Sequence, residues 1–451
     1  MRVLVVGGGG REHALSWALK RDTPDATVFA APGNPGTAQL GTNLTIPVTA
    51  ADDLVMAARE HRIDLVVIGP EAPLAAGLAD RLRAAGYAVF GPGAAAARIE
   101  SSKAFAKDVM RSAGVPTAAS RTFSALHPAL DYIKTNPEPL VVKASGLAAG
   151  KGVVVCATRD AAARAARAML EGAFGEAGHE VIIEQFLEGE ELSVLALTDG
   201  ERILILPAAQ DHKRLGEGDT GPNTGGMGAY CPVSIATAAL LERVRREVLE
   251  PTLRELAVRG VRYAGVLYAG LMVGPDGTPY VLEFNCRFGD PEAQALLPLL
   301  PGVTRHLTEI AVAEGGRGGR GGGGGGGGGG SGWRPQAIRR PARAAVATVL
   351  AAPGYPGKPE LGAAIVVPRD LDAGTLVFHS GTYRDPDGAL RVHGGRVLTV
   401  TALGDSVTQA ARQSARGCEL IVFQGKTWRR DIGGREIARE GRGRRAGAAR
   451  G

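Results

Sequence analysis

The sequence predicts an α/β protein of several domains, and three observations lead to that prediction. The chain has 451 residues, more than one hydrophobic core usually organises, so we expect about two to four domains. Residues 1–100 alternate short apolar strands with helical segments, which is the pattern of an open parallel sheet. Hydrophobic residues make up 45% of the chain, a normal value for a soluble globular protein.

The net charge of +6 does not indicate nucleic-acid binding, because of where the charges lie. Residues 313–343 carry six Arg against one Glu, and residues 435–451 carry six Arg against two Glu. Together these segments hold +9, which leaves the rest of the chain near −3. We expect both segments to be unstructured, so we expect no nucleic-acid partner.

Cysteine usage and hydropathy indicate a cytoplasmic protein. Cys156, Cys231, Cys286 and Cys418 are scattered and form no C-x-x-C pair, as expected of reduced thiols. The N-terminus enters a buried strand directly and lacks the pattern of a signal peptide. No apolar run reaches about 18 residues, so we expect no membrane span. We also expect a monomer.

In the N-terminal region, the carboxyl ends of the strands are the expected binding edge. Strands are expected at residues 3–6, 28–31, 65–68 and 87–90, and helices at residues 12–20 and 74–85. The loops that follow the strands are residues 7–13, 32–37 and 69–71.

The four glycines at residues 7–10 do not make a nicotinamide-cofactor motif. Glu12 or His13, depending on the frame, stands where the third glycine is required, and no acidic residue ends the second strand. Glycines followed by Arg11 at a helix start suit a single phosphate, held by backbone N–H groups and the helix dipole. A plain tight turn is the alternative.

Residues 101–190 indicate a nucleotide site. A helix is expected from Lys103 to Met110, with Ser101 or Ser102 as its N-cap. Lys143 faces inward on a strand at 140–143, and the Gly-rich loop 144–152 leads to a second strand at 153–156. The loop lacks the spacing and the Ser or Thr of a Walker A motif, but it can close over a polyphosphate as a lid. A flexible hairpin tip with a snorkelling lysine is the alternative.

Further strands and a polar loop follow. Residues 181–186 and the alternating residues 192–196 predict strands, the second half-buried. Residues 205–232 form a polar, structure-poor run that suits a loop around a small polar ligand, or a solvated surface loop. A helix is expected at 235–258, and a strand at 265–273 should pair with the one that starts at Tyr280.

The stretch Val281–Glu292 is the strongest candidate for a metal site. Glu283 and Asn285 are two residues apart on a strand, so both side chains leave the same face. Their oxygens suit Mg²⁺, which takes one or two protein oxygens and leaves its other positions to substrate phosphates. An ordinary strand that ends in a polar loop is the alternative.

The sequence resembles the glycinamide ribonucleotide synthetase family of the ATP-grasp superfamily. The motifs that carry the resemblance occur in family order and cover residues 1–300 almost without a gap; they are residues 9–14, 32–37, 143–152, 210–214, 219–230 and 283–292. After residue 300 the resemblance thins, and it resumes in short stretches from Ala344 to Gly433.

The resemblance implies an ATP-grasp ligase of three domains. These are an N-terminal α/β domain (1–100), a two-lobed ATP-grasp core (101–312) with a small lid lobe at about 118–188, and a C-terminal β-rich domain (344–434). The family has a helical linker where this chain has a Gly/Arg-rich segment, residues 313–343. Its glycine run at 321–330 cannot bury apolar surface, so we expect disorder there, and a ragged basic tail at 435–451.

The activity that the resemblance implies is the ATP-dependent joining of glycine to 5-phosphoribosylamine through a glycyl phosphate, the second step of purine synthesis. The implied ATP-binding residues are Lys103, Lys143, Gly146, Gly150, Lys151, Gly152, Glu184, Phe186, Leu187 and Glu191, with Mg²⁺ or Mn²⁺ on Glu283 and Asn285. Catalytic roles are implied for Arg287 and Asp290, near glycine and the transferred phosphate, and for Asp211 in the acceptor pocket. The implied substrate-binding residues are Gly10, Arg11, Glu12, His13, Gly33 and Asn34 for phosphoribosylamine, and Lys213, Asp219, Thr220, Asn223, Thr224 and Gly225 around the acceptor pocket.

Three other functions remain as alternatives. One is a different ATP-grasp carboxylate–amine ligase, such as a carboxylating purine enzyme. A Rossmann-type oxidoreductase is weakened by the missing third glycine. A non-catalytic ATP-binding protein is disfavoured by the intact pair Lys103 and Lys143 together with Glu283 and Asn285.

Overall fold

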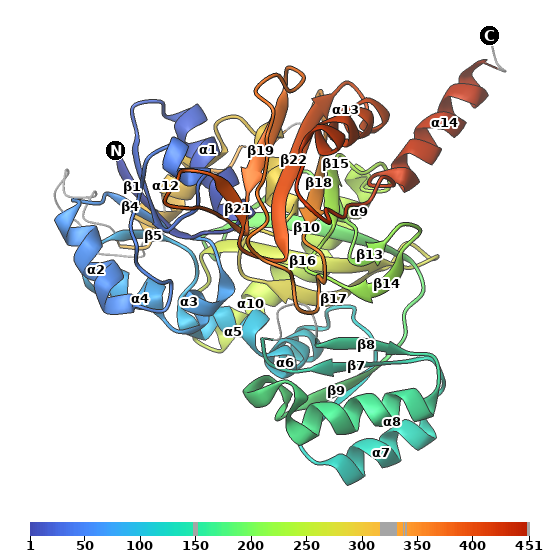
Figure 1. Cartoon of the computed structure of the whole chain (residues 1–451). Helices are drawn as coiled ribbons and strands as arrows, with labels where there is room; N and C mark the ends of the chain where they lie inside the picture. Colours follow the sequence, from blue (N-terminus) through green and yellow to red (C-terminus); the bar gives the residue numbers. More distant parts are fainter. Residues whose placement is uncertain (148–151, 316–331, 337, 339–340, 449–451) are drawn as a thin grey trace.

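The computed structural model describes residues 1–147, 152–315, 332–336, 338 and 341–448 (Figure 1). Among these residues no helix has the length and apolar character needed to cross a membrane. The described chain forms an N-terminal α/β unit, a central antiparallel sheet, a separate small lobe and a C-terminal sheet.

The N-terminal unit is a five-stranded parallel sheet, which confirms the expected open α/β arrangement. The sheet order is β3-β2-β1-β4-β5, with β1 Arg2–Gly7, β2 Thr27–Pro32, β3 Thr42–Asn43, β4 Leu65–Ile68 and β5 Ala88–Phe90. Its helices are α1 Gly10–Asp22, α2 Ala51–Glu60, α3 Glu71–Ala75 and α4 Leu78–Ala84. The single helix expected at 74–85 is wrong, because Gly77 has φ +82° and separates α3 from α4.

The central sheet is antiparallel, in the order β11-β10-β16-β17. Its strands are β10 Glu190–Thr198, β11 Ile203–Ile205, β16 Gly265–Val273 and β17 Pro279–Asn285. The predicted pairing of β16 with β17 is confirmed. The prediction of a half-buried strand at 192–196 is wrong, because every residue from Leu192 to Thr198 is buried. The sheet is therefore covered on both faces.

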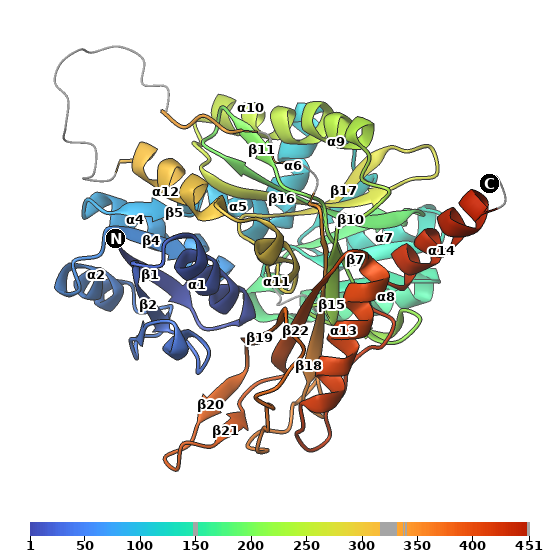
Figure 2. The same cartoon turned by 90° about the horizontal axis from the view of Figure 1, so that it is seen from above.

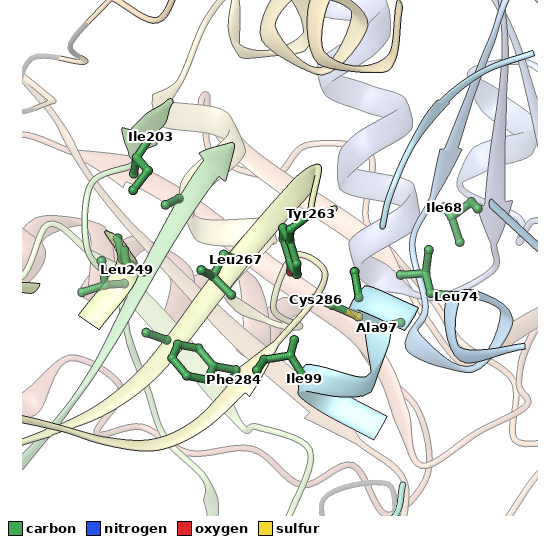
Figure 3. Close-up of a cluster of buried hydrophobic side chains, with 14 of the residues drawn as sticks. Ile68, Leu74, Ala97, Ile99, Ile203, Leu249, Tyr263, Leu267, Phe284 and Cys286 are labelled. Carbon is green, nitrogen blue, oxygen red and sulfur yellow. The ribbon is translucent and has the colours of Figure 1, made fainter. Parts of the chain in front are cut away.

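Helices around this sheet join it to the N-terminal unit. They are α5 Ala94–Ser101, α6 Lys103–Ala113, α9 Ala238–Val244, α10 Glu250–Val258, α11 Glu292–Leu296 and α12 Val303–Ala313. A π-helical stretch at 245–249 connects α9 to α10 within the helix expected at 235–258. Ser102 caps α6, since its hydroxyl accepts a hydrogen bond from the Phe105 N–H at 3.2 Å. One apolar cluster runs from Ile68 and Leu74 to Leu267 and Phe284 (Figure 3).

Residues 120–185 form a separate small lobe. Its antiparallel sheet has the order β6-β9-β7-β8, with β6 Ser120–Phe123, β7 Leu140–Ala144, β8 Val153–Cys156 and β9 Val181–Gln185. Two helices pack on it, α7 Leu126–Thr135 and α8 Arg159–Ala168. A hydrophobic cluster of its own holds the lobe together, and the lobe stands apart from the rest of the chain in Figure 1. It occupies the place expected for the lid.

The C-terminal sheet borrows strands from the middle of the chain. Its order is β12-β15-β18-β22-β19, and its strands are β12 Gln210–Asp211, β15 Gly228–Cys231, β18 Ala344–Ala351, β19 Thr375–His379 and β22 Arg396–Gly404. Smaller pairs are β13 Arg214–Gly216 with β14 Thr220–Asn223, and β20 Thr382–Arg384 with β21 Leu390–Val392. The prediction that 205–232 is structure-poor is therefore wrong, because its backbone pairs with strands that are distant in sequence.

Helix α13 Val407–Leu420 packs on this sheet, and α14 Gly434–Ala448 follows it and projects from the body (Figures 1 and 2). The prediction of a ragged tail from Arg435 is wrong for the first turns of α14. Glu436 accepts hydrogen bonds from the Ser234 N–H and hydroxyl, at 3.1 and 3.0 Å, and Arg439 pairs with Glu190.

The linker expected at 313–343 is in part ordered. Trp333 is buried, and its indole N–H donates to His306 Nδ1 at 3.1 Å. The disorder expected for 313–343 is therefore wrong at Trp333. The glycine run at 321–330 lies outside the described residues.

Candidate functional site

A cavity of about 700 Å³ lies between the lid sheet and the central sheet. The N-terminal unit contributes Arg11 and Glu71 to its wall, and the C-terminal sheet contributes Arg396. The predicted site residues that line it are Arg11, Lys103, Lys143, Gly152, Glu184, Phe186, Leu187, Glu191, Asp211, Lys213, Asn223, Thr224, Gly225, Glu283, Asn285, Arg287 and Asp290. Segments far apart in the sequence thus converge on one space.

Lysines dominate the lid end of the cavity. Lys143 comes from β7, where its ammonium donates to the Leu282 carbonyl at 3.0 Å and pairs with Glu184 at 2.8 Å. Lys103 comes from the first turn of α6 and donates to the Gly146 carbonyl at 3.2 Å. Burial lowers the pKa of Lys103, and Lys143 adds to that fall while Glu283 opposes it. Gly150 and Lys151, also predicted here, lie outside the described residues.

The segment between the lid and the central sheet supplies an apolar wall. Phe186 and Leu187 follow β9, and Val155 of β8 faces the same space. Beyond them Glu191, on β10, pairs with Lys213 at 2.9 Å. An apolar slot next to a carboxylate can take an aromatic base and the hydroxyl groups of a sugar.

Glu283 and Asn285 offer oxygen ligands side by side on β17, and both line the cavity. Burial would raise the pKa of Glu283, but Lys213, Lys103 and Lys143 lower it below its ordinary value, so the carboxylate is charged. Among the described residues no group of three or more His, Cys, Asp or Glu side chains could hold a metal by itself. These two residues fit a hard cation that takes its remaining ligands from a bound polyphosphate.

Asp211, at the start of the C-terminal sheet, lies near three other acids, Glu292, Glu191 and Glu283, of which Glu292 is buried. The Tyr268 hydroxyl donates to Glu292 at 2.5 Å and lies 2.8 Å from the Ser193 hydroxyl. Burial raises the pKa of Asp211 to about 8; Lys213 opposes the rise, and Glu292 adds to it. Asp211 can therefore hold or release a proton near neutral pH.

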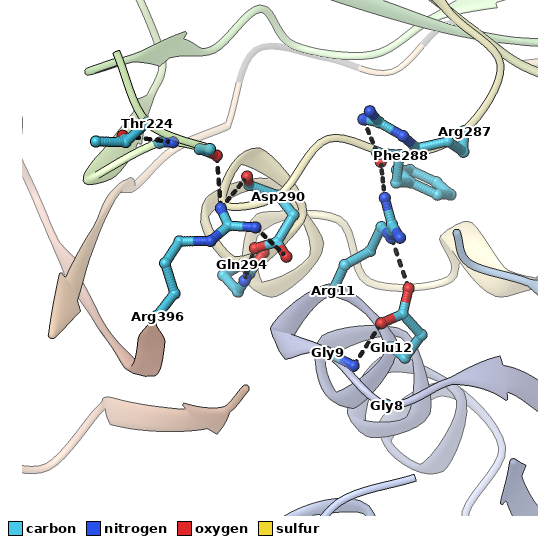
Figure 4. A network of polar contacts seen from close by, with 12 residues as sticks. Gly8, Gly9, Arg11, Glu12, Thr224, Arg287, Phe288, Asp290, Gln294 and Arg396 are labelled. Atoms are coloured by element: carbon cyan, nitrogen blue, oxygen red, sulfur yellow. Dashed lines mark hydrogen bonds and ion pairs between the residues drawn. The ribbon is translucent and has the colours of Figure 1, made fainter. Parts of the chain in front are cut away.

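A network of arginines and carboxylates forms the far end of the cavity (Figure 4). The guanidinium of Arg396 donates to the carbonyl of Gly225 at 2.5 Å, the carbonyl of Asp290 at 2.6 Å and the carboxylate of Asp290 at 3.0 Å. Arg11 and Arg287 both donate to the Phe288 carbonyl, each at 3.2 Å. Burial would raise the pKa of Asp290, but Arg396 and Arg11 lower it.

Arg287 is held by two further carboxylates and by Asn285. It contacts Glu100 at 2.7 Å and Glu71 at 3.3 Å, and it donates to Asn285 Oδ1 at 3.0 Å. Burial alone would lower the pKa of Arg287, but Glu100 and Glu71 raise it. Three side chains therefore hold the Arg287 guanidinium before any ligand enters.

Several predicted residues do not reach the cavity wall. Gly33 and Asn34 belong to the junction with the C-terminal sheet, where the Asn34 amide donates to the His379 carbonyl at 2.8 Å. Asp219 pairs instead with Arg429 and Arg435, at 2.9 and 2.7 Å. The others outside the wall are Gly10, Glu12, His13, Gly146 and Thr220.

Glu12 occupies the place at which a phosphate was predicted. Its carboxylate accepts a hydrogen bond from the Gly9 N–H at 2.7 Å and another from Arg11 at 2.6 Å. The start of α1 is therefore satisfied by the chain itself. His13 faces the C-terminal sheet, where its Nδ1 accepts the His379 N–H at 2.9 Å, and burial lowers its pKa to about 3.

Sequence reasoning left several residues of the wall without a role, and six of them can act on the chemistry of the site. They are Glu71, Glu100, Lys107, Tyr268, Glu292 and Arg396. Lys107 could have been found one helical turn after Lys103. Glu71, Glu292 and Arg396 lie within stretches that were singled out for other residues, whereas Glu100 and Tyr268 carry no local pattern.

Models of three domains of one family match the chain in order. They are the phosphoribosylglycinamide synthetase N domain at residues 1–100, its ATP-grasp (A) domain at 101–293 and its C domain at 345–435. The chain belongs to the phosphoribosylglycinamide synthetase family. The ATP-grasp fold expected from the sequence is thereby confirmed. The ordered match of all three domains favours this family over the Rossmann-type oxidoreductase.

Named relatives in this family extend over almost the whole chain. The phosphoribosylamine–glycine ligase of Vibrio cholerae is 45% identical over 98% of this chain and 99% of its own length. That of Escherichia coli is 44% identical over 98% of this chain and 100% of its own length.

Solved structures agree. The Thermotoga maritima phosphoribosylamine–glycine ligase matches with a TM-score of 0.80 at 34% identity, covering 96% of this chain and 100% of that one. A biotin carboxylase domain from Hydrogenobacter thermophilus 2-oxoglutarate carboxylase, solved with MgADP and bicarbonate, matches with a TM-score of 0.69 at 17% identity, over 95% of this chain and 91% of that one. The second match bears on the fold alone.

Proposed function

We propose that the chain joins glycine to 5-phosphoribosylamine at the expense of ATP, giving glycinamide ribonucleotide, ADP and phosphate. Family membership and the names of relatives at 44–45% identity support this activity. The observation that carries it is one cavity with a lysine-rich end under the lid and an arginine–carboxylate network at the opposite end. A nucleotide and an acceptor can then meet inside it.

The chemistry runs in two steps. A glycine carboxylate oxygen attacks the γ-phosphorus of ATP, so a P–O bond to ADP breaks and an acyl phosphate forms. The amine of phosphoribosylamine then attacks the acyl carbon, the C–O bond to phosphate breaks, and the amine gives up a proton. Both steps need charge neutralisation and exclusion of water rather than a protein nucleophile.

At the lid end, Lys103 and Lys143 neutralise the charge of the ATP phosphates. Phe186 and Leu187 line the pocket for the adenine base, and Glu191 accepts hydrogen bonds from the ribose hydroxyl groups. Glu283 and Asn285 would hold Mg²⁺ or Mn²⁺, which when bound neutralises the charge that develops on the phosphates. The segment from Gly146 to Gly152 would cover them. Its residues 148–151 lie outside the described part of the chain, so this role stays a prediction.

At the opposite end, Arg287 and Asp290 orient the glycine and the transferred phosphate. Asp211, with its pKa near 8, is placed to accept the proton that the attacking amine releases. The loop with Asn223, Thr224 and Gly225 closes the acceptor side of the cavity. Five residues predicted to bind phosphoribosylamine would instead support the residues of the cavity wall without touching this substrate; they are Gly10, Glu12, His13, Gly33 and Asn34.

An ADP-release assay on the purified chain tests this function. Release is expected only when glycine and phosphoribosylamine are both present with ATP and Mg²⁺. The carboxylating ATP-grasp enzymes are the second candidate, favoured only by the shared fold. Release that depends on bicarbonate and not on glycine would replace the proposal with that candidate.

The compartment and the oligomeric state belong to the same proposal. The four cysteines are buried thiols outside any disulfide, as suits a reducing cytoplasm. A monomer is expected, and sedimentation of the purified chain checks it.

A further inference from the structure

Lys107 is a buried lysine of the cavity wall that has no role in the chemistry described above. It lies on α6 one turn after Lys103, and its side chain is 4% exposed. Its ammonium lies 3.1 Å from Glu184 Oε1 and donates to the Thr117 hydroxyl at 2.7 Å. Thr117 in turn donates to the Val281 carbonyl at 2.6 Å. Lys107 therefore connects the central unit to the lid strand β9 at the point where the chain passes between them.

Glu184 is shared between two lysines of different lobes. Its other oxygen contacts Lys143 at 2.8 Å, and the Glu184 side chain is 2% exposed. Strands β7 and β9 place Val141 opposite Glu184, so Lys143 is the diagonal neighbour on the same face. Two ammonium groups thus share one buried carboxylate.

Within the group of Lys107, Glu184 and Lys143, two ammonium groups face one carboxylate, and Glu283 is the further carboxylate that acts on Lys143. Burial lowers the pKa of Lys107, and Lys143 lowers it further, while Glu184 opposes both. Buried charge without a counter-ion is costly, so a polyanion that enters the cavity relieves it. Lys143 can supply that relief only if its ammonium leaves Glu184 and the Leu282 carbonyl.

We propose that Lys107 is a positioning residue that holds Glu184, so that Lys143 can turn from Glu184 to the phosphates of the nucleotide. Among the described residues no aligned hydrogen bond reaches Glu184 Oε1, so the ion pair with Lys107 is what compensates this oxygen. Without Lys107, the negative charge of Glu184 is compensated by Lys143 alone, so the Lys143 ammonium stays on Glu184 instead of turning to the phosphates. The inference rests on the proposed use of ATP.

The variant Lys107→Met tests this role. The KM for ATP and the dissociation constant of ATP measured by calorimetry should both rise about tenfold or more, the range for removing one partner of a charged contact. The kcat should change less than about threefold, because the loss falls on binding rather than on the chemical step. Lys134→Met, which removes an exposed lysine of the lid, is the matched control and should change neither constant.

Variants of Glu184 separate positioning from a purely structural role. In the Glu184→Gln background no carboxylate can retain Lys143, so adding Lys107→Met should change the ATP constants by less than about twofold. The single variant Glu184→Gln then decides, because with no carboxylate to retain Lys143 it should bind ATP at least as tightly as the wild type. If Lys107 only ties the lobes together through its ion pair with Glu184, Glu184→Gln weakens ATP binding as much as Lys107→Met does. That result overturns the proposal. Thr117→Val, which keeps the charge, should weaken ATP binding in the same direction and serves if Lys107→Met does not fold.

Failure of this inference and failure of the proposed function give different results. A wild type that turns over glycine, with a Lys107→Met variant that binds ATP as tightly, overturns the role of Lys107 alone. A wild type that binds ATP but releases no ADP with glycine and phosphoribosylamine overturns the proposed function. The calorimetric comparison still decides the role of Lys107 in that case.

Discussion

The two ends of the cavity are built on opposite principles. Under the lid, Lys107 and Lys143 share the buried carboxylate of Glu184, and Lys103 lies in the same wall, where burial lowers its pKa. At the far end, arginines and carboxylates are matched in pairs, among them Arg396 with Asp290 and Arg287 with Glu100. An end where buried lysines share a carboxylate can turn them toward a polyanion, whereas an end where each arginine has its own carboxylate is prepared to hold side chains in place. The lid end is therefore suited to bind the nucleotide, and the far end is suited to orient the acceptor.

Removing Glu283, one of the two expected metal ligands, should have the largest effect. Glu283→Ala is expected to lower kcat by about a thousandfold, because neutralisation of the transferred phosphate is lost, while the fold is kept. Steady-state kinetics and thermal melting measure the two quantities. Asp276→Ala, in the turn of the same hairpin, is the control and should behave as the wild type. Activity like that of the wild type in Glu283→Ala would remove the metal assignment.

The next substitution acts on the far end alone. Arg396→Met removes three hydrogen bonds to Gly225 and Asp290. The KM for phosphoribosylamine should rise about tenfold or more, while the KM for ATP changes less than about twofold. Initial-rate measurements with each substrate varied give both values. Equal changes in both constants would mean that the two ends do not act separately.

A smaller effect concerns proton binding by Asp211. Its pKa is about 8 in the folded chain and near 3.8 when unfolded, so between these values the folded state holds more protons. The stability of the wild type should therefore fall as the pH rises from 5 to 8. Asp211→Asn cannot bind this proton. Between pH 5 and 8 the Tm of the variant should therefore fall by a few degrees less than the Tm of the wild type. Parallel melting curves for the two proteins would contradict the raised pKa.

The smallest effect is expected outside both ends. Deleting the ten glycines at 321–330 should leave kcat and both KM values within about twofold, since the contact of Trp333 with α12 is made by His306. The same assay measures this. Loss of activity on deletion would show that the run contributes to the cavity or to docking of the C-terminal sheet.

The lid end was the part that the sequence could predict best. Strand β8 of the lid begins and ends where its apolar run does, as do β4 of the N-terminal unit and β16 of the central sheet. Lys143, the Gly-rich loop, Glu283 and Asn285 each belong to a short local pattern, and such patterns follow from backbone periodicity. The resemblance to a family then placed these separate patterns on one site.

The far end was harder, because it is assembled from pairs that are distant in sequence. Arg396 reaches Asp290 across 106 positions, and Arg287 reaches Glu71 across 216. The carboxylate of Glu12 fills the start of α1, which the glycine pattern alone could not show. The pairing of 210–231 with the C-terminal sheet was missed for the same reason, since strand pairing depends on partners that local composition does not contain.

An isotope-transfer experiment tests the central claim, that the two ends meet at an acyl phosphate. Glycine with ¹⁸O in both carboxylate oxygens is converted with ATP and phosphoribosylamine, and the products are analysed by mass spectrometry. One labelled oxygen should leave with inorganic phosphate, while the other stays in the amide of the product. Inorganic phosphate without label would contradict the account, because the glycine carboxylate would then never have been phosphorylated.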